Sequence, residues 1–341
     1  MAARREAGKG PRCARGFGAA AVAAIGFTVM ACARAAVVAG TVDPAPPPDD
    51  GPSGSAAGHG SISIAYLDTL AEGLRIDPHT TLPSGTVRSR GARLDLDYQF
   101  TDHWSAQVGI PFLSNRYSGI APHCPTRAPP QCAQAPALDP SHPESQFLDD
   151  GGDHATWQDW TFGATYQTRL GSYFITPGIA LSVPSHDYTF FANAAVGQRI
   201  WQLELSATLA HQFDFSNWYY RLGYGYVFAE KVLDTRVNHH RFDLELGYFI
   251  NEKVAARMFA TGRAGHGYAA GDLLPRTAGQ TNAYWYHHDQ ISEHNYAGVG
   301  AGVDYGFGAH WTWSTSVQRL VWGQTVFDFK YALESRLSRA F

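Results

Sequence analysis

Apolar and polar residues alternate with a period of two along most of the chain beyond residue 60. In the segment 326–341 one face carries Phe327, Phe329, Tyr331, Leu333, Leu337 and Phe341, and the other carries Asp328, Lys330, Glu334, Arg336 and Ser338. The segments 93–100, 201–209 and 241–250 repeat this pattern. Because successive side chains of a β-strand point to opposite faces, the alternation predicts strands with one apolar and one polar face.

Turn residues divide this region into twelve predicted strands. Their ranges are 61–71, 84–100, 104–117, 156–170, 173–185, 196–213, 218–229, 237–250, 254–267, 293–307, 311–322 and 326–341. Strands of soluble proteins average about 5–6 residues, and these are about twice as long. A strand that crosses a bilayer needs about 9–11 residues, so the lengths favour a membrane barrel over a soluble sandwich.

Short and long connections alternate between the predicted strands. Short turns lie at 101–103, 171–172, 214–217, 251–253 and 308–310, and longer loops lie near 72–83, 118–155, 186–193, 230–236 and 268–292, with a briefer one at 323–325. Aromatic pairs flank three short turns: Phe100 with Trp104, Phe213 with Trp218, and Phe307 with Trp311. We therefore expect an all-β fold, a transmembrane antiparallel up-and-down β-barrel with short periplasmic turns, longer extracellular loops and aromatic girdles.

The N-terminal region has the charge and hydropathy of an export signal. Residues 1–35 contain six of the 26 Lys and Arg residues and one of the 30 Asp and Glu residues, with an apolar run from Phe17 to Ala31. This order predicts a Sec signal peptide, 1–35, cleaved after Ala35; a lipoprotein signal with Cys32 lipidated is an alternative. Residues 36–60 are predicted to be a disordered periplasmic linker, and 61–341 the outer-membrane barrel. The remaining chain is acidic, so no nucleic-acid partner is expected.

Two cysteines, Cys124 and Cys132, remain after removal of the signal peptide. They lie in a proline-rich stretch of a chain sent to an oxidising compartment, so we expect a disulfide between them and no metal site. Phe341 is an aromatic residue in the position of a barrel assembly signal. Outer-membrane lipid, the barrel-assembly machinery and periplasmic chaperones are the partners that this placement implies.

Several strand-like motifs carry a family resemblance. They are the run from Tyr98 to Phe112 (YQFTDHWSAQVGIPF), Val183 to Asp187 (VPSHD), Tyr305 to Trp311 (YGFGAHW) and Val321 to Gln324 (VWGQ). Together, over most of 84–341, they resemble the outer-membrane β-barrel family named for the MetA pathway of phenol degradation. His186 departs from the family pattern, which tends to have glycine there. The resemblance implies a transporter-like barrel that passes small solutes, hydrophobic or aromatic ones among them, and it implies no particular substrate.

Sixteen charged residues fall on the polar face of the predicted strands. They are Arg93, Asp95, Asp97, Asp159, Arg169, Glu204, Arg221, Arg241, Asp243, Glu245, Arg257, Asp304, Asp328, Lys330, Glu334 and Arg336. We expect them to line the lumen, either as a polar network that fills a narrow barrel or as the wall of a wetted channel. Gly298, Gly300, Gly302 and Gly306 share one inward face and are expected to leave space on that wall.

Other function classes have weaker support in the sequence. A structural or adhesive barrel with a plugged lumen is an alternative, with the 118–155 loop as a lid or a binding surface. An outer-membrane hydrolase is a further alternative, but the His-x-Ser-Asn-Gly lipase pattern is absent. His287, His288 and His294 with Asp289 could bind a transition metal, and the acidic residues of 149–153 could bind calcium. An ordinary polar loop is the favoured interpretation of both segments. The sequence therefore predicts no enzyme, no catalytic residue, no metal and no cofactor.

Overall fold

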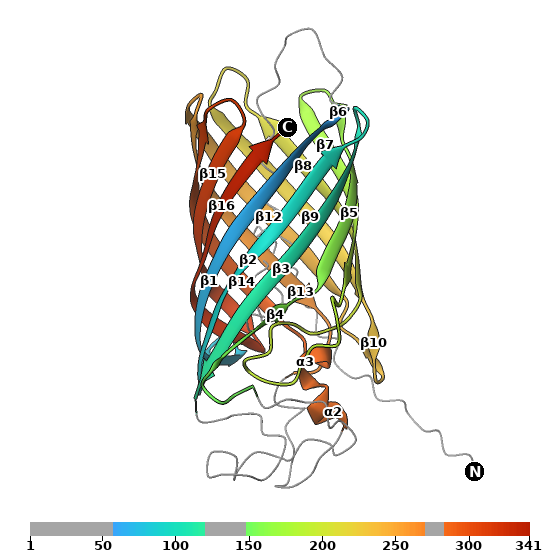
Figure 1. Ribbon diagram of the computed structural model, residues 1–341, viewed down its shortest axis with the longest axis vertical. Helices are drawn as coiled ribbons and strands as arrows, with labels where there is room; N and C mark the ends of the chain where they lie inside the picture. Colours follow the sequence, from blue (N-terminus) through green and yellow to red (C-terminus); the bar gives the residue numbers. More distant parts are fainter. Residues whose placement is uncertain (1–56, 120–147, 270–282) are drawn as a thin grey trace, which may run out of the picture.

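The computed structural model describes residues 57–119, 148–269 and 283–341 (Figure 1). The predicted signal peptide, most of the predicted linker, and Cys124 and Cys132 with their predicted disulfide lie outside these residues. The described chain is almost entirely β-structure, with two one-turn helices, α2 (Ala283–Tyr286) and α3 (His288–Ile291). No helix in the described ranges is long and apolar enough to cross a membrane.

Twelve antiparallel strands form the barrel. In chain order they are β1 (His59–Asp77), β2 (Thr80–Gln99), β3 (Trp104–Ser118), a fourth strand in three pieces, β4 (Asp153–Trp157), β5 (Trp160–Tyr166) and β6 (Thr168–Leu170), then β7 (Tyr173–Val183), β8 (Gln202–Gln212), β9 (Trp218–Ala229), β12 (His239–Asn251), β13 (Val254–Gly265), β14 (Asn295–Phe307), β15 (Trp311–Gln324) and β16 (Val326–Ala340). A small hairpin of β10 (Lys231–Val232) and β11 (Thr235–Arg236) lies in the loop between β9 and β12.

The sheet closes on itself between its first and last strands. β1 pairs with β2 on one side and with β16 on the other, with Ser61 opposite Ala340. The backbone N–H of Phe341 also donates to Gly60 O at 2.9 Å, and the N–H of Gly60 donates back to Phe341 O at 3.0 Å. The predicted all-β, closed, twelve-stranded antiparallel barrel is thus confirmed, because no strand edge is left open at the seam.

The two ends of the barrel differ as the connections predicted. The C-terminus lies with the short turns at one end, and α2, α3 and the β10–β11 hairpin lie at the other (Figure 1). The large apolar side chains of the outer wall remain exposed, among them Ile64, Leu94, Leu246 and Val299. An apolar outer surface of this extent requires a hydrocarbon surrounding, because in water it would be an aggregation surface.

This outer wall allows a direct test of membrane insertion. Leu246, near the middle of β12, faces outward, so Leu246→Arg is expected to destabilise the folded barrel by about 2–4 kcal/mol. Urea unfolding of the protein refolded into lipid vesicles measures this difference. Phe215→Arg, in the short turn between β8 and β9, is the matched control and should change the free energy of unfolding by less than about 1 kcal/mol. Equal effects of both substitutions would contradict an outer face immersed in lipid.

Several predicted loop boundaries are wrong. The expected loop at 72–83 is a hairpin, because β1 and β2 continue to Asp77 and Thr80 with two residues between them. Gly73, with φ at +75°, forms a bulge that keeps the two strands paired beyond it. The expected loop at 323–325 is a single residue, Thr325, with φ at +55°. The predicted strand 196–213 begins only at Gln202, and its first residues belong to the loop before it.

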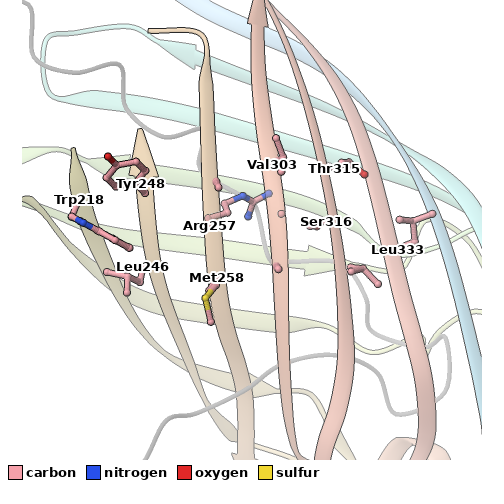
Figure 2. Close-up of a pocket in the computed structure, with 13 residues that line it drawn as sticks. Trp218, Leu246, Tyr248, Arg257, Met258, Val303, Thr315, Ser316 and Leu333 are labelled. Atoms are coloured by element: carbon pink, nitrogen blue, oxygen red, sulfur yellow. The ribbon is translucent and has the colours of Figure 1, made fainter. Parts of the chain in front are cut away.

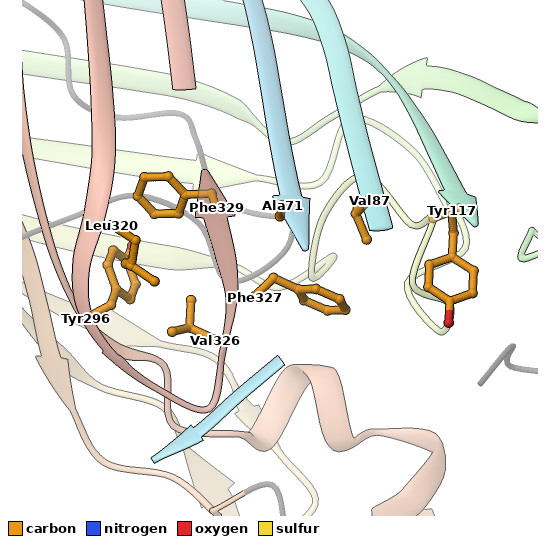
Figure 3. Packing of buried hydrophobic residues seen from close by; sticks show 9 residues of the cluster. Ala71, Val87, Tyr117, Tyr296, Leu320, Val326, Phe327 and Phe329 are labelled. Carbon is orange, nitrogen blue, oxygen red and sulfur yellow. The ribbon is translucent and has the colours of Figure 1, made fainter. Parts of the chain in front are cut away.

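One end of β16 departs from the predicted alternation. The pairing of β1 with β16 is irregular around Ala71, which lies opposite Phe329. Phe327 and Phe329 consequently pack in an interior cluster with Ala71 and Val87 (Figure 3). The expectation that these two phenylalanines share the outer face with Leu337 is wrong, since a bulge moves the following residues to the opposite face.

Candidate functional site

Buried ion pairs cover much of the inner wall. Arg257 lies between two carboxylates, with its Nη1 3.4 Å from Glu245 and its Nε 3.2 Å from Asp304. Arg221 reaches the same Glu245 at 3.2 Å. These residues come from β9, β12, β13 and β14, which are neighbours in the sheet, and cross-strand pairing places them side by side. Pairing of this kind is what permits charges to be buried.

Two further groups of ion pairs continue this pattern. Arg241 contacts Glu204 at 2.6 Å and Asp243 at 3.4 Å. Around the seam, Arg93 contacts Asp95 at 2.8 Å, and Arg336 contacts Glu334 at 2.8 Å and Asp95 at 3.8 Å. Each pair joins residues on the same strand, or on strands with at most one strand between them. The pairs therefore run along the wall and do not bridge the lumen.

The remaining predicted lumen residues lie near the two ends. Arg169 is exposed beside the short turn at 171–172, with its guanidinium over the ring of Phe174. Asp97 lies opposite Ser61, near the same end. Asp328 contacts Lys330 and Arg75 at 2.9 Å each, toward the loop end. Asp159 lies in the break between β4 and β5 and accepts a hydrogen bond from Tyr188.

Three of the four predicted glycines of β14 do not leave the expected space, whereas at Gly306 the nearest atom to an added Cβ is Lys253 O at 3.8 Å. A Cβ on Gly300 would meet the ring of Phe259 at 2.4 Å, and one on Gly298 would meet Gln318 Nε2 at 2.4 Å. At Gly302, Ser316 and Arg257 lie at 3.0 and 3.3 Å from the same position. The absence of a side chain thus lets long neighbouring side chains lie flat along the wall. The prediction of free space is wrong for Gly298, Gly300 and Gly302.

The loop between β7 and β8, residues 184–201, enters the barrel at the loop end. We call it the inner loop. Ala194 is fully buried in a cluster with Val87, Leu320 and Phe329, among others (Figure 3). Those partners come from β2, β15 and β16, which are not the strands that the inner loop connects. The inner loop therefore crosses the mouth and packs on inward-facing residues of distant strands.

Two polar side chains hold the tip of the inner loop. The buried carboxylate of Asp149 accepts hydrogen bonds from the backbone N–H of Asn193 at 3.1 Å and of Ala194 at 2.9 Å, and from Asn193 Nδ2 at 2.8 Å. Asn115, on β3, donates from Nδ2 to Ala195 O at 2.6 Å. Hydrogen bonds to a charged group are stronger than neutral ones, so Asp149 is the main polar anchor of the tip.

The inner loop is tied to its own base by Tyr188 and Arg199. The phenol of Tyr188 donates to Asp159 and accepts from the backbone N–H of Arg199 at 2.9 Å. Burial raises the pKa of Tyr188 well above its ordinary value, and the charge of Asp159 raises it further, so the phenol keeps its proton. Arg199 donates to Tyr188 O at 3.0 Å and adopts a left-handed backbone, with φ at +53°.

The short helices cover the inner loop from outside the barrel. Gln198 donates to Asp289 O at 2.6 Å, and Gln290 donates to Gln198 O at 2.7 Å, an exchange between the inner loop and α3. Phe190 and Phe191 pack on Tyr286 of α2, with ring centroids 5.1 and 5.3 Å apart. The described loops thus form a cap that is continuous with the interior of the barrel.

A hollow of about 540 Å³ lies on the outer side of the barrel wall and is not part of the lumen (Figure 2). Its floor includes the small residues Ala256, Ala301 and Gly302, and Trp218 and Met258 are among the larger residues around it. These larger side chains belong to the exposed apolar face. Its place on the apolar outer face makes it part of the lipid-facing surface and not of a path through the lumen.

The described residues bear on two of the alternatives, metal binding and a serine–histidine pair. No group of three or more His, Cys, Asp or Glu residues within them is close enough to bind a metal. Ser185 Oγ lies 2.8 Å from His186 Nδ1, but it donates to Trp157 O. The other ring nitrogen of His186 contacts the hydroxyl of Thr156, so no carboxylate orients the imidazole as a hydrolase would need.

Several residues of the interior were missed from the sequence. Arg263, on β13, continues the inward series of Arg257, Phe259 and Thr261, so the period of two could have identified it. Asn115 follows inward-facing Leu113 in the same way. Asp149 has no such signal, because it precedes β4 and is defined by its contacts with a loop that is distant in sequence.

A closed antiparallel barrel with an apolar outside and paired charges inside is the architecture of outer-membrane β-barrels. An outer-membrane channel from Pseudomonas putida F1 has this fold in common with the chain, with a TM-score of 0.61 at 15% identity over 86% of this chain and 99% of that one. The β domain of the Bordetella autotransporter BrkA (TM-score 0.44, 11% identity, 83% and 99% covered) and the Pseudomonas putida toluene transporter TodX (0.36, 10%, 82% and 89%) are more distant. No protein-family model and no curated protein matches the chain.

Proposed function

We propose that this protein is an outer-membrane channel for small solutes, with hydrophobic or aromatic solutes among them. The observation that carries the proposal is the direction of the lumenal ion pairs, which run along the wall and do not join opposite sides of the barrel. The fold in common with a channel of known structure supports the same function. Sequence motifs such as Tyr98 to Phe112 support membership of the MetA-pathway family, and no enzymatic activity is proposed.

The proposal includes the route to the membrane. Residues 1–35 act as a cleaved Sec signal peptide and 36–60 as a periplasmic linker, although β1 already begins at His59. Barrel-assembly machinery and periplasmic chaperones receive the chain, with Phe341 as the recognised terminus. Cys124 and Cys132 form a disulfide within the extracellular loop. Trypsin treatment of intact cells and N-terminal sequencing of the mature protein test these placements.

The second candidate is a structural or adhesive barrel with a permanently plugged lumen. The buried inner loop favours it, because that loop crosses the mouth of the barrel. The two candidates differ in one property, which is whether the inner loop moves aside. Conductance separates them.

Accessibility of single cysteines in planar bilayers tests the channel. Cys124 and Cys132, the two cysteines of the mature chain, are first replaced by serine, and cysteine is then introduced at Ser316 or at Thr315. Ser316 lies beside inward-facing Gly302, whereas its neighbour Thr315 pairs with outward-facing Val303 (Figure 2). A charged thiol reagent is expected to reduce the conductance of Ser316→Cys by half or more and to leave Thr315→Cys unchanged. Absence of discrete conductance steps from correctly folded protein, with and without the inner loop released, would contradict the channel.

A further inference from the structure

Arg263 is a buried cation of the inner wall near the loop end of β13. Its neighbours across the sheet are Arg241 of β12 on one side and Tyr296 of β14 on the other. Only 5% of its surface is exposed. The two arginines are directly opposite each other, an arrangement that is destabilising unless the charges are compensated.

Compensation is unequal between these two arginines. Arg241 contacts Glu204 and Asp243, whereas within the described ranges no Asp or Glu lies within ion-pair distance of Arg263. The Nε of Arg263 also has no hydrogen-bond partner among the described residues. Other lumenal arginines, including Arg93, Arg221, Arg257 and Arg336, each contact at least one carboxylate. Arg263 therefore differs from these arginines in having no carboxylate partner among the described residues.

Among the described residues, the groups in electrostatic contact with Arg263 are His239, His294 and Tyr296, and no Asp or Glu is among them. Burial lowers the pKa of His294 to about 4, and the charge of Arg263 contributes, so this imidazole is neutral at pH 7. The charge of Asp289, in α3, favours the protonated form of His294, and its Oδ1 lies 3.4 Å from His288 Nε2. Asp289 forms no ion pair with Arg263.

An apolar surface adjoins this positive site. Tyr296 belongs to the interior cluster that also contains Leu320, Val326 and Phe329 (Figure 3). A guanidinium binds a planar carboxylate with two parallel hydrogen bonds. The residues of the cluster beside it are buried and apolar, which suits a ligand with an apolar body. An isolated buried cation is costly, and a bound anion removes that cost.

We propose that Arg263, with Tyr296 beside it, is a binding site for the carboxylate of a small apolar organic acid, reached from the loop end of the barrel. This inference rests on the proposed function in that the ligand is a solute of the lumen. The test measures ligand binding and not conductance. A failure of the binding site therefore does not imply that the channel function fails, and the reverse also holds.

Binding to the refolded full chain in non-ionic detergent is measured by calorimetry, with benzoate as the probe and benzyl alcohol as its neutral counterpart. Wild-type protein is expected to bind benzoate saturably and at least tenfold more tightly than benzyl alcohol. Arg263→Met should weaken benzoate binding at least tenfold and leave benzyl alcohol unchanged. Tyr296→Phe, which retains the guanidinium, should have a smaller effect. No saturable benzoate binding to the wild type, or equal affinity for both probes, would overturn the proposal.

Two controls sharpen the assignment. Chloride at the same ionic strength should compete at least tenfold less effectively than benzoate; equal competition would make this a simple anion site and overturn the assignment to an organic acid. In urea unfolding without benzoate, Arg263→Met should be at least as stable as the wild type, and Arg241→Met less stable, because that change leaves Glu204 and Asp243 unpaired. Equal loss of stability in both variants would show that Arg263 is already neutralised within the protein.

Discussion

Asp149→Ala is expected to raise the mean conductance of the protein in planar bilayers about tenfold or more. The carboxylate of Asp149 accepts three hydrogen bonds from Asn193 and Ala194 at the tip of the inner loop. A hydrogen bond to a charged group contributes about 1.5–3 kcal/mol, and each 1.4 kcal/mol changes an equilibrium tenfold. Loss of the carboxylate therefore shifts the inner loop from the closed arrangement toward one that leaves the mouth open.

Asp150→Ala is the matched control for this substitution. Asp150 is the next residue, but it accepts hydrogen bonds from His154 and from the N–H of Gly152, both in its own turn. Its replacement should leave conductance within about twofold of the wild type. Limited proteolysis after Arg199 provides a second readout, faster in Asp149→Ala alone. If both variants conduct like the wild type, the inner loop is not held by Asp149.

Arg257→Met is expected to destabilise the barrel by about 3–5 kcal/mol, the cost of leaving a buried charge without its partner. Arg257 is the common partner of Glu245 and Asp304, whose side chains are 7% and 6% exposed. Its removal leaves Asp304 without that contact and Glu245 with Arg221 alone among the described ion pairs. Urea unfolding in lipid vesicles measures the loss.

A second substitution identifies the cause. Adding Asp304→Asn to Arg257→Met removes the carboxylate that lost its ion-pair contact and should recover part of the lost stability. Lys330→Met is the control, because its side chain is 39% exposed and its contact with Asp328 is expected to contribute less than about 1 kcal/mol. An additive loss in the double variant would show that packing of the Arg257 side chain, and not charge, is what the barrel needs.

The strands could be predicted from sequence because their information is local. A residue such as Leu246 or Glu245 reveals its face through its neighbours two positions away, whatever the rest of the chain does. The hairpin at 72–83 was missed because Gly73 and Pro83 are typical loop residues. Around Leu82, β2 pairs with β1, and its pairing with β3 starts only at Thr86, so Pro83 lies where a missing N–H is tolerated.

The inner loop could not be predicted in the same way. Its residues Phe190 to Val196 have no alternation, and their burial comes from walls that are distant in sequence. The same limit applies to the ion pairs. Alternation places Arg257 and Arg263 on one face of β13, but strand register decides that the first meets Asp304 and the second meets none of the described carboxylates.

The seam between β1 and β16 has a consequence for quality control in the cell. The pairing of Ser61 with Ala340 joins residues from nearly opposite ends of the described chain. Until it forms, both strands present open edges, and an open edge invites aggregation or recognition by proteases. A chain shortened by nonsense mutation or clipped before closure therefore cannot complete a smaller barrel with the same register. Its two unpaired strands remain open to proteases. Pairing of the first and last strands therefore distinguishes complete molecules from defective ones.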